Sequence, residues 1–130
     1  MLERCLKESP ASEEDVDGVL ESLKQRRDES IVSPFCVSSP AMRMKAEGIG
    51  TMVGRLLLGT AEKIPPTELV DTTGAGDAFI GGIIYALCTD MPSERMLPFA
   101  SKVAAEVCRS LGTRAGLPRL MDPCLSSLLL

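Results

Sequence analysis

The hydrophobic pattern is strongest in the second half of the chain, where an apolar run covers residues 78–88. The run is apolar nearly all round a helical wheel, which predicts a helix over residues 78–87 that is buried on most of its faces. Gly81 and Gly82 lie inside this helix and lower its intrinsic propensity, so they indicate close packing against a neighbouring backbone or ligand. Before the run, residues 67–70 are predicted to form a strand.

Two other stretches have apolar residues at helical spacing. Ser12 can cap a helix that starts with acidic residues, and one apolar stripe follows it. The stripe of this predicted surface helix is Val16, Val19, Leu20 and Leu23. A second helix is predicted over residues 98–111, with Gly112 as the glycine that commonly follows a helix C-terminus. Its predicted stripe is Ala100, Val103, Ala104, Val107, Cys108 and Leu111.

The other segments are shorter and less regular. Residues 2–6 are predicted to form a short strand, and so are residues 52–58, where Val53, Leu56, Leu57 and Leu58 are apolar. Residues 29–50 are interrupted by serine and proline and lack periodicity, so we expect loop or disorder there. The order strand, loop, strand, turn, helix, helix predicts part of an α/β layered domain.

Composition narrows the functional classes. The net charge of −4 and the aromatic content of 3% argue against a nucleic-acid-binding surface. The longest apolar run is too short to span a bilayer, and the first residues show no apolar signal region, so we expect an intracellular, cytoplasmic or organellar protein with no membrane partner. Five cysteines without C-x-x-C spacing, in a chain with no histidine, favour reduced thiols over a zinc site.

The segment Asp71-Thr72-Thr73-Gly74-Ala75-Gly76-Asp77 joins the predicted strand to the apolar helix. A short turn at a helix start directs free backbone N–H groups and the positive helix end toward one point, which favours an anion. The segment is neither a Walker loop nor the dinucleotide fingerprint, because the required lysine and third glycine are missing. A plain turn before a buried helix is the alternative, but the two acids and two threonines favour the anion site.

Asp77 has two interpretations. As a helix N-cap, its carboxylate would accept hydrogen bonds from backbone N–H groups. As a general base, it would take a proton from a hydroxyl that attacks a phosphate, while the turn amides stabilise the transferring group. The helix dipole favours the charged form of Asp77.

The segment 71–77, together with residues 99–118, resembles the C-terminal signature of the ribokinase-like, or pfkB, carbohydrate kinases. The resemblance implies a ribokinase-like layered α/β fold and ATP-dependent phosphorylation of a sugar or a nucleoside-like alcohol. It implies Asp77 as the catalytic base and a phosphate site formed by Gly74, Ala75 and Gly76. Ser101 would lie near the adenine, unless it is an ordinary polar residue on a helix.

The resemblance also implies a monovalent cation such as K⁺, bound by oxygen atoms alone, as suits a hard cation. The residues that would hold it are Asp71, Thr73, Val107, Ser110, Gly112 and Gly116. The alternative is that Asp71, Thr72 and Thr73 are strand-end residues that bond the turn internally. Mg²⁺ ligands would lie mostly upstream of this chain, because the family's Asn-x-x-Glu motif is missing from a sequence without asparagine.

These departures indicate the C-terminal portion of a kinase, inactive by itself. We expect a weakly structured segment with one helix over residues 1–50, the nucleotide- and phosphate-binding part over residues 51–120, and a tail over residues 121–130. The alternative is a non-catalytic truncated isoform that binds nucleotide or a partner. Its exposed sheet edge would favour self-association or pairing with a full-length relative.

Overall fold

The computed structural model describes residues 13–129 of the chain, which form a mixed α/β structure. The predicted α/β class is therefore confirmed. The chain divides into two compact units, one of residues 13–27 with 38–57 and the other of residues 28–37 with 58–129. The predicted strand over residues 2–6 and the predicted cap Ser12 lie outside the described residues.

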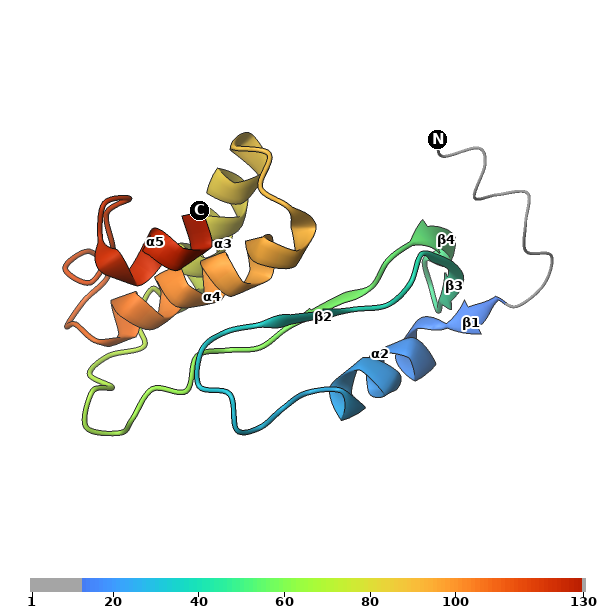
Figure 1. Ribbon diagram of the computed structural model, residues 1–130, viewed down its shortest axis with the longest axis horizontal. Helices are drawn as coiled ribbons and strands as arrows, with labels where there is room; N and C mark the ends of the chain where they lie inside the picture. The colour runs from blue at the N-terminus through green and yellow to red at the C-terminus, as the bar shows by residue number, and fades with distance from the viewer. Residues whose placement is uncertain (1–12, 130) are drawn as a thin grey trace. The chain divides into compact units, whose positions relative to one another are not determined.

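The first unit combines one helix with a small sheet (Figure 1). Strand β1 (Glu14–Asp15) runs parallel to β3 (Met42–Ala46), and β3 pairs antiparallel with β4 (Gly50–Gly54). Helix α2 (Val16–Gln25) follows β1 directly, and its N-cap is Asp15, whose side chain accepts a hydrogen bond from the Asp17 N–H at 2.9 Å. The buried apolar residues of this unit are Val19, Leu23 and Met44.

The expectation of loop over residues 29–50 is wrong, because β2 (Cys36–Ser38) and β3 both lie there. In β3 the residues Met42-Arg43-Met44-Lys45 alternate, with Met44 buried and both cations exposed. The single strand predicted over residues 52–58 is divided between β4 and β5 (Leu57–Gly59). Strands β2 and β5 pair in a separate two-stranded sheet.

The second unit is mainly helical, and α3 (Ala75–Cys88), α4 (Ser93–Cys108) and α5 (Pro123–Leu129) lie together in it (Figure 1). A Cβ added at Gly82 would lie 2.8 Å from the Cα atom of Ala100, so the glycine lets α3 and α4 approach closely. This contact confirms close packing at Gly82, whereas the space beside Gly81 is open. The buried hydrophobic cluster comprises Ala78, Ala86, Phe99, Val103, Val107 and Leu125.

Several element predictions in this unit need correction. Helix α4 begins five residues before Pro98 and ends at Cys108, so Leu111 lies beyond the helix and is 78% exposed. Gly112 has a φ of 81°, but it lies in the following loop and not directly after the helix. Residues 67–70 form turn and coil where a strand was expected. The expected tail over residues 121–130 contains α5, which buries Leu125.

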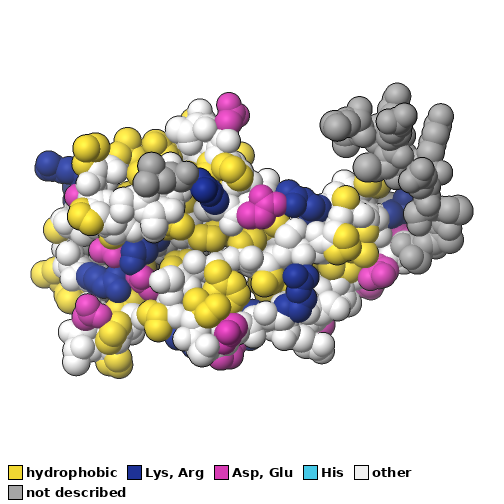
Figure 2. Space-filling view, viewed as in Figure 1, with side chains coloured by type: hydrophobic (Ala, Val, Ile, Leu, Met, Phe, Trp, Pro, Cys, Tyr) yellow, Lys and Arg dark blue, Asp and Glu magenta, His cyan; other side chains and the backbone are white. Residues whose placement is uncertain are grey.

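The surface of the described residues is not uniformly polar. Hydrophobic side chains reach the surface in several places on the face that Figure 2 shows. Helix α3 was expected to be buried on most faces, but Ile80, Ile84 and Leu87 are each more than half exposed. Within residues 13–129, no helix combines the length and the hydropathy that crossing a bilayer requires.

Candidate active site

The turn before α3 depends on a left-handed glycine. Gly74 is the N-cap residue of α3 with a φ of 82°, and a Cβ at this position would lie 2.9 Å from the Cγ2 atom of Thr113. Any larger residue at position 74 would be strained, because of the positive φ and because its Cβ would contact Thr113. The Ala75 N–H donates to the Thr72 carbonyl at 3.2 Å, and the Ala78 N–H donates to the Gly74 carbonyl at 2.9 Å. The amides between them, those of Gly76 and Asp77, lie in the first turn of the helix.

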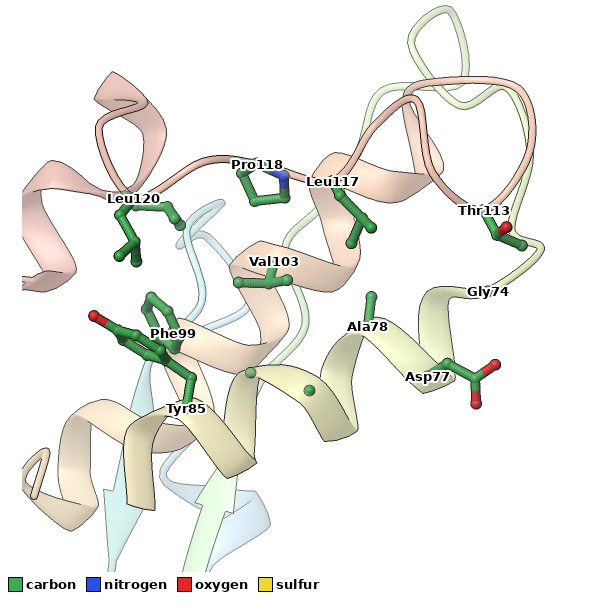
Figure 3. A pocket seen from close by; sticks show the side chains of 13 residues that line it. Gly74, Asp77, Ala78, Tyr85, Phe99, Val103, Thr113, Leu117, Pro118 and Leu120 are labelled. Atoms are coloured by element: carbon green, nitrogen blue, oxygen red, sulfur yellow. The ribbon is translucent and has the colours of Figure 1, made fainter. Parts of the chain in front are cut away.

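Asp77 is the third residue of α3 and is exposed. The interpretation of Asp77 as the N-cap is wrong, because Gly74 occupies that position. Within residues 13–129, no hydrogen bond or ion pair to the Asp77 carboxylate is found. Figure 3 shows this carboxylate beside the turn, pointing away from the Tyr85 and Phe99 rings. The carboxylate is therefore accessible to a molecule bound at the start of the helix.

Asp71 connects the turn to the loop after α4. Its Oδ1 atom accepts a hydrogen bond from the Thr73 N–H at 2.9 Å, and its Oδ2 atom accepts one from the Gly112 N–H at 3.0 Å. Hydrogen bonds from the Thr73 side chain and amide, and then from the Gly112 amide, lower the pKa of Asp71. The internal bonding that the sequence left open for this residue is therefore present.

Two further contacts hold the end of α4 near the turn. The carbonyl of Cys108 accepts hydrogen bonds from the N–H groups of Val70 and Asp71, at 2.9 and 3.2 Å. A Cβ at Gly116 would lie 2.7 Å from the Glu106 carbonyl oxygen and 2.9 Å from the Val107 Cα atom, so this glycine lies against the helix end. The six residues of the predicted cation site thus lie in two groups of three neighbours: Asp71 with Thr73 and Gly112, and Val107 with Ser110 and Gly116. Within residues 13–129 there is no cluster of His, Cys, Asp and Glu that could hold a metal, and the carbonyl site stays a prediction.

A cavity of about 350 Å³ opens beside the turn, with Asp77 and Thr113 at one end (Figure 3). Its wall includes the rings of Tyr85 and Phe99, whose centroids lie 5.4 Å apart. Thr113 and both rings were not predicted as site residues from the sequence, because helical spacing alone does not show that two helices and a later loop meet here. The remaining lining residues are mostly apolar: Gly74, Ala78, Gly81, Gly82, Val103, Leu117, Pro118, Leu120 and Leu125.

Ser101 is half-buried on α4 and does not line this cavity. It lies two residues from Phe99 and from Val103, which both line the cavity. Two residues are about half a helical turn, so Ser101 lies on a different side of α4 from those residues. Its predicted place near an adenine therefore stays a prediction, and it would require the nucleotide base to lie on that other side.

A cluster of charged side chains links the segment after β5 to α4 and the residue that follows it. The Glu62 carboxylate, whose side chain is 6% exposed, pairs with Lys102 and accepts a hydrogen bond from Arg109 Nη1 at 2.8 Å. Arg109 also bonds Glu106 at 2.9 Å. Burial raises the pKa of Glu62, but the hydrogen bonds from Lys102 and Arg109 more than offset this effect and lower the pKa overall. This cluster was not predicted from the sequence, because Glu62 and Arg109 are separated by 47 positions.

Comparison with known proteins adds to this geometry. Residues 58–120 match the model of the pfkB family carbohydrate kinases. The chain is 43% identical over 56 residues to an uncharacterized sugar kinase of Archaeoglobus fulgidus, a match that covers 43% of the chain and 22% of that protein. It is 31% identical over 107 residues to ribokinase of Mus musculus, a match that covers 72% of the chain and 33% of that protein. It is 33% identical over 70 residues to adenosine kinase of Schizosaccharomyces pombe, a match that covers 54% of the chain and 21% of that protein.

The predicted resemblance to the pfkB family carbohydrate kinases is therefore confirmed over residues 58–120. The matched residues contain the turn, α3, α4 and the loop with Gly112. The chain spans about a third of the length of mouse ribokinase and about a fifth of the other two relatives.

Proposed function

We propose that this chain supplies the phosphoryl-transfer turn of a kinase that phosphorylates a sugar or a related alcohol with ATP. The observation that carries the proposal is the position of the Asp77 carboxylate, exposed in the first turn of α3 next to Gly74, Ala75 and Gly76. A carboxylate beside a helix N-terminus repels an anion that binds there. The arrangement is useful where the carboxylate handles a proton and the amides handle a phosphate.

In the proposed reaction, Asp77 accepts the proton of the acceptor hydroxyl as its oxygen attacks the γ-phosphorus of ATP. The bond between that phosphorus and the β–γ bridging oxygen breaks, and ADP leaves with the electron pair. The N–H groups of Gly76 and Asp77 and the positive end of α3 stabilise the negative charge on the transferring phosphoryl group. Such a transfer depends mainly on positioning and electrostatics, which suits a turn that Asp71 bonds to the loop after α4.

The cofactors of the proposal follow from the same residues. Kinases of this type need Mg²⁺ with ATP, and its ligands would lie mainly outside this chain. A K⁺ ion fits the oxygen donors of Asp71 and Thr73 together with the carbonyls of Val107, Ser110, Gly112 and Gly116, since every donor is an oxygen. Ser101 would contact the adenine. The acceptor is a sugar or a nucleoside-like molecule, because the relatives include both a ribokinase and an adenosine kinase.

We further propose that residues 51–120 are the nucleotide- and phosphate-binding part of a ribokinase-like domain, and that the chain corresponds to the C-terminal portion of that domain. In this proposal the chain alone has no kinase activity, since about two thirds of a relative such as mouse ribokinase has no counterpart in it. The exposed apolar residues of α3 support a second candidate, a non-catalytic module that pairs with a full-length relative or with itself.

A chimera distinguishes the two candidates. The chain replaces the segment of mouse ribokinase with which it aligns, and ATP-dependent phosphorylation of ribose is measured for the chimera and for the isolated chain. The catalytic proposal predicts turnover by the chimera and none by the isolated chain. Truncated ribokinase that lacks the replaced segment is the negative control. A folded, ATP-binding chimera without turnover would support the non-catalytic module.

A further inference from the structure

Gly81 is a glycine inside α3 that the packing of the helices does not explain. A glycine in a helix interior is less favourable than alanine, and the sequence indicated a neighbouring backbone or ligand as the reason for Gly81 and Gly82. Gly82 has its neighbour in Ala100, whereas among residues 13–129 a Cβ at Gly81 would have nothing beside it within 4 Å. Gly81 also lines the cavity beside the turn. A side chain at position 81 would therefore enter the space of the cavity, and a ligand remains as the reason for this glycine.

The middle of this cavity presents no polar side chain. Asp77 and Thr113 lie at one end, and the Tyr85 hydroxyl lies at the other end (Figure 3). Asp77 is the one charged residue among the described residues that line the cavity, so an anion would have no positive side chain to pair with. A sugar would leave several hydroxyl groups without hydrogen-bond partners, and each such group is costly to bury. The cavity therefore favours an uncharged, apolar molecule.

The aromatic wall and the volume narrow the shape of that molecule. The rings of Tyr85 and Phe99 have centroids 5.4 Å apart, with 30° between their planes, and both line the cavity. Aromatic rings pack favourably against one another in offset or edge-to-face arrangements. An apolar cavity of about 150 Å³ holds one benzene ring. The volume of about 350 Å³ found here therefore has room for two fused rings.

We propose that the cavity beside α3 is a binding site for an uncharged molecule of two fused aromatic rings, which lies over Gly81 and against the rings of Tyr85 and Phe99. A single small polar group of the ligand would lie at the cavity mouth, in contact with water. The site goes beyond the proposed kinase function and does not depend on it. Adenine also has two rings, but the hydrogen-bonding atoms around its edge would lack partners here. Its predicted place beside Ser101 lies on a different side of α4.

The test titrates the isolated chain with 2-naphthol, which has two fused rings and one hydroxyl and is uncharged at neutral pH. Isothermal titration calorimetry should show one molecule bound per chain, with a Kd below about 1 mM. The chain contains one tyrosine and no tryptophan, so its intrinsic emission reports on Tyr85 alone. We expect 2-naphthol to quench this emission over the same concentration range. The thermal midpoint of the chain should rise with the 2-naphthol concentration, because the ligand binds the folded state.

Two variants locate the bound molecule. Gly81→Leu fills the cavity from α3 without a clash, so we expect the affinity for 2-naphthol to fall at least about tenfold. Gly18→Leu is the matched control, because Gly18 is a helical glycine of α2 that also has open space around it and does not line the cavity. It should bind like the wild type. If Gly81→Leu does not fold, Tyr85→Leu removes one ring of the wall and should weaken binding about three- to tenfold by calorimetry.

Three outcomes would overturn the proposal. The first is the absence of saturable binding by the wild type. The second is an equal affinity of the wild type and the folded cavity variant, since the molecule would then bind elsewhere on the chain. The third is displacement of 2-naphthol by ATP, because the cavity would then be part of the nucleotide site. The kinase activity of the chimera is a separate readout, so a failure of the proposed function leaves this site standing.

Discussion

The Gly112 amide donates a hydrogen bond to Asp71 Oδ2 at 3.0 Å, although the two residues are 41 positions apart. The other oxygen of the same carboxylate accepts the Thr73 N–H. One side chain therefore fixes the loop after α4 to the turn that presents Asp77. This relationship gives Asp71 a positioning role that does not depend on a bound cation.

Replacing Asp71 should loosen both connections. In Asp71→Ala we expect faster hydrogen exchange of the Thr73 and Gly112 amides, because both lose their acceptor. In Asp71→Asn one acceptor oxygen remains, so only one of the two amides should lose its protection. Exchange measured by NMR on the full chain checks both variants. Asp15→Ala is a control, since it removes the acceptor of the Asp17 amide in the other unit. Unchanged exchange at Gly112 in Asp71→Ala would contradict the positioning role.

The Glu62 cluster should make stability depend on pH. The folded-state pKa of Glu62 is lowered from its ordinary value of 4.5, so the unfolded chain binds the proton more readily. The stabilisation is therefore fully present above about pH 5 and is lost as the pH falls through the lower, folded-state pKa. Glu62→Gln should lower the unfolding free energy by about 1–3 kcal/mol at neutral pH, with a smaller difference in acid. If the unfolding free energies of the wild type and Glu62→Gln differ by the same amount at every pH, the ionised Glu62 carboxylate is not the source of the pH dependence.

The glycines of the turn should differ in their tolerance of a side chain. Gly74→Ala should destabilise the chain by about 1–2 kcal/mol, because an L-residue is strained at the positive φ and its Cβ meets Thr113. Gly76→Ala should stabilise it by about 0.5–1 kcal/mol, because Gly76 is helical and has open space around it. Substitution at Gly76 should nevertheless affect nucleotide binding: in an active chimera, Gly76→Val should raise the KM for ATP, since the valine side chain would crowd a phosphate bound at the turn amides. Equal stabilities of the two alanine variants would contradict this assignment.

A second pair of glycines tests the contact between α3 and α4. A methyl group at Gly82 would overlap the backbone of Ala100, so Gly82→Ala should lower the unfolding free energy by about 1–3 kcal/mol. Gly81→Ala is the matched control, because the space beside Gly81, the preceding residue of the same helix, is open. The control should be neutral or slightly stabilising. Chemical denaturation of both variants measures the difference, and a loss at Gly81 equal to that at Gly82 would argue against the close approach.

The sequence predicted the parts of the fold that depend on local pattern. Residues 78–87 lie within the observed helix α3, and the cost of a glycine inside it correctly indicated the contact at Gly82. Local pattern also gave one wrong helix start, because the helix was predicted to begin at Pro98, which instead lies inside α4. Strand β3 was missed although Met42, Met44 and Ala46 alternate with polar residues, since serine and proline nearby indicated a loop.

The candidate site was predictable only in part, for a physical reason. The turn at Gly74 and the position of Asp77 follow from contiguous residues. The bond from Gly112 to Asp71 and the ion pairs of Glu62 join segments 40 or more positions apart, and hydrophobic periodicity contains no information on such pairs. The cavity beside Tyr85 and Phe99 likewise exists only where separate helices and a loop meet.

The most direct test of the proposed chemistry is the turnover of the chimera with Asp77→Asn. Asparagine has nearly the same shape but cannot accept the proton, so we expect kcat to fall by about 10²–10⁴-fold while the KM for ATP changes little. Asp90→Asn, an exposed acid outside the turn, is the control and should keep full turnover. Near-normal kcat in Asp77→Asn would show that Asp77 is not the general base and would contradict the account.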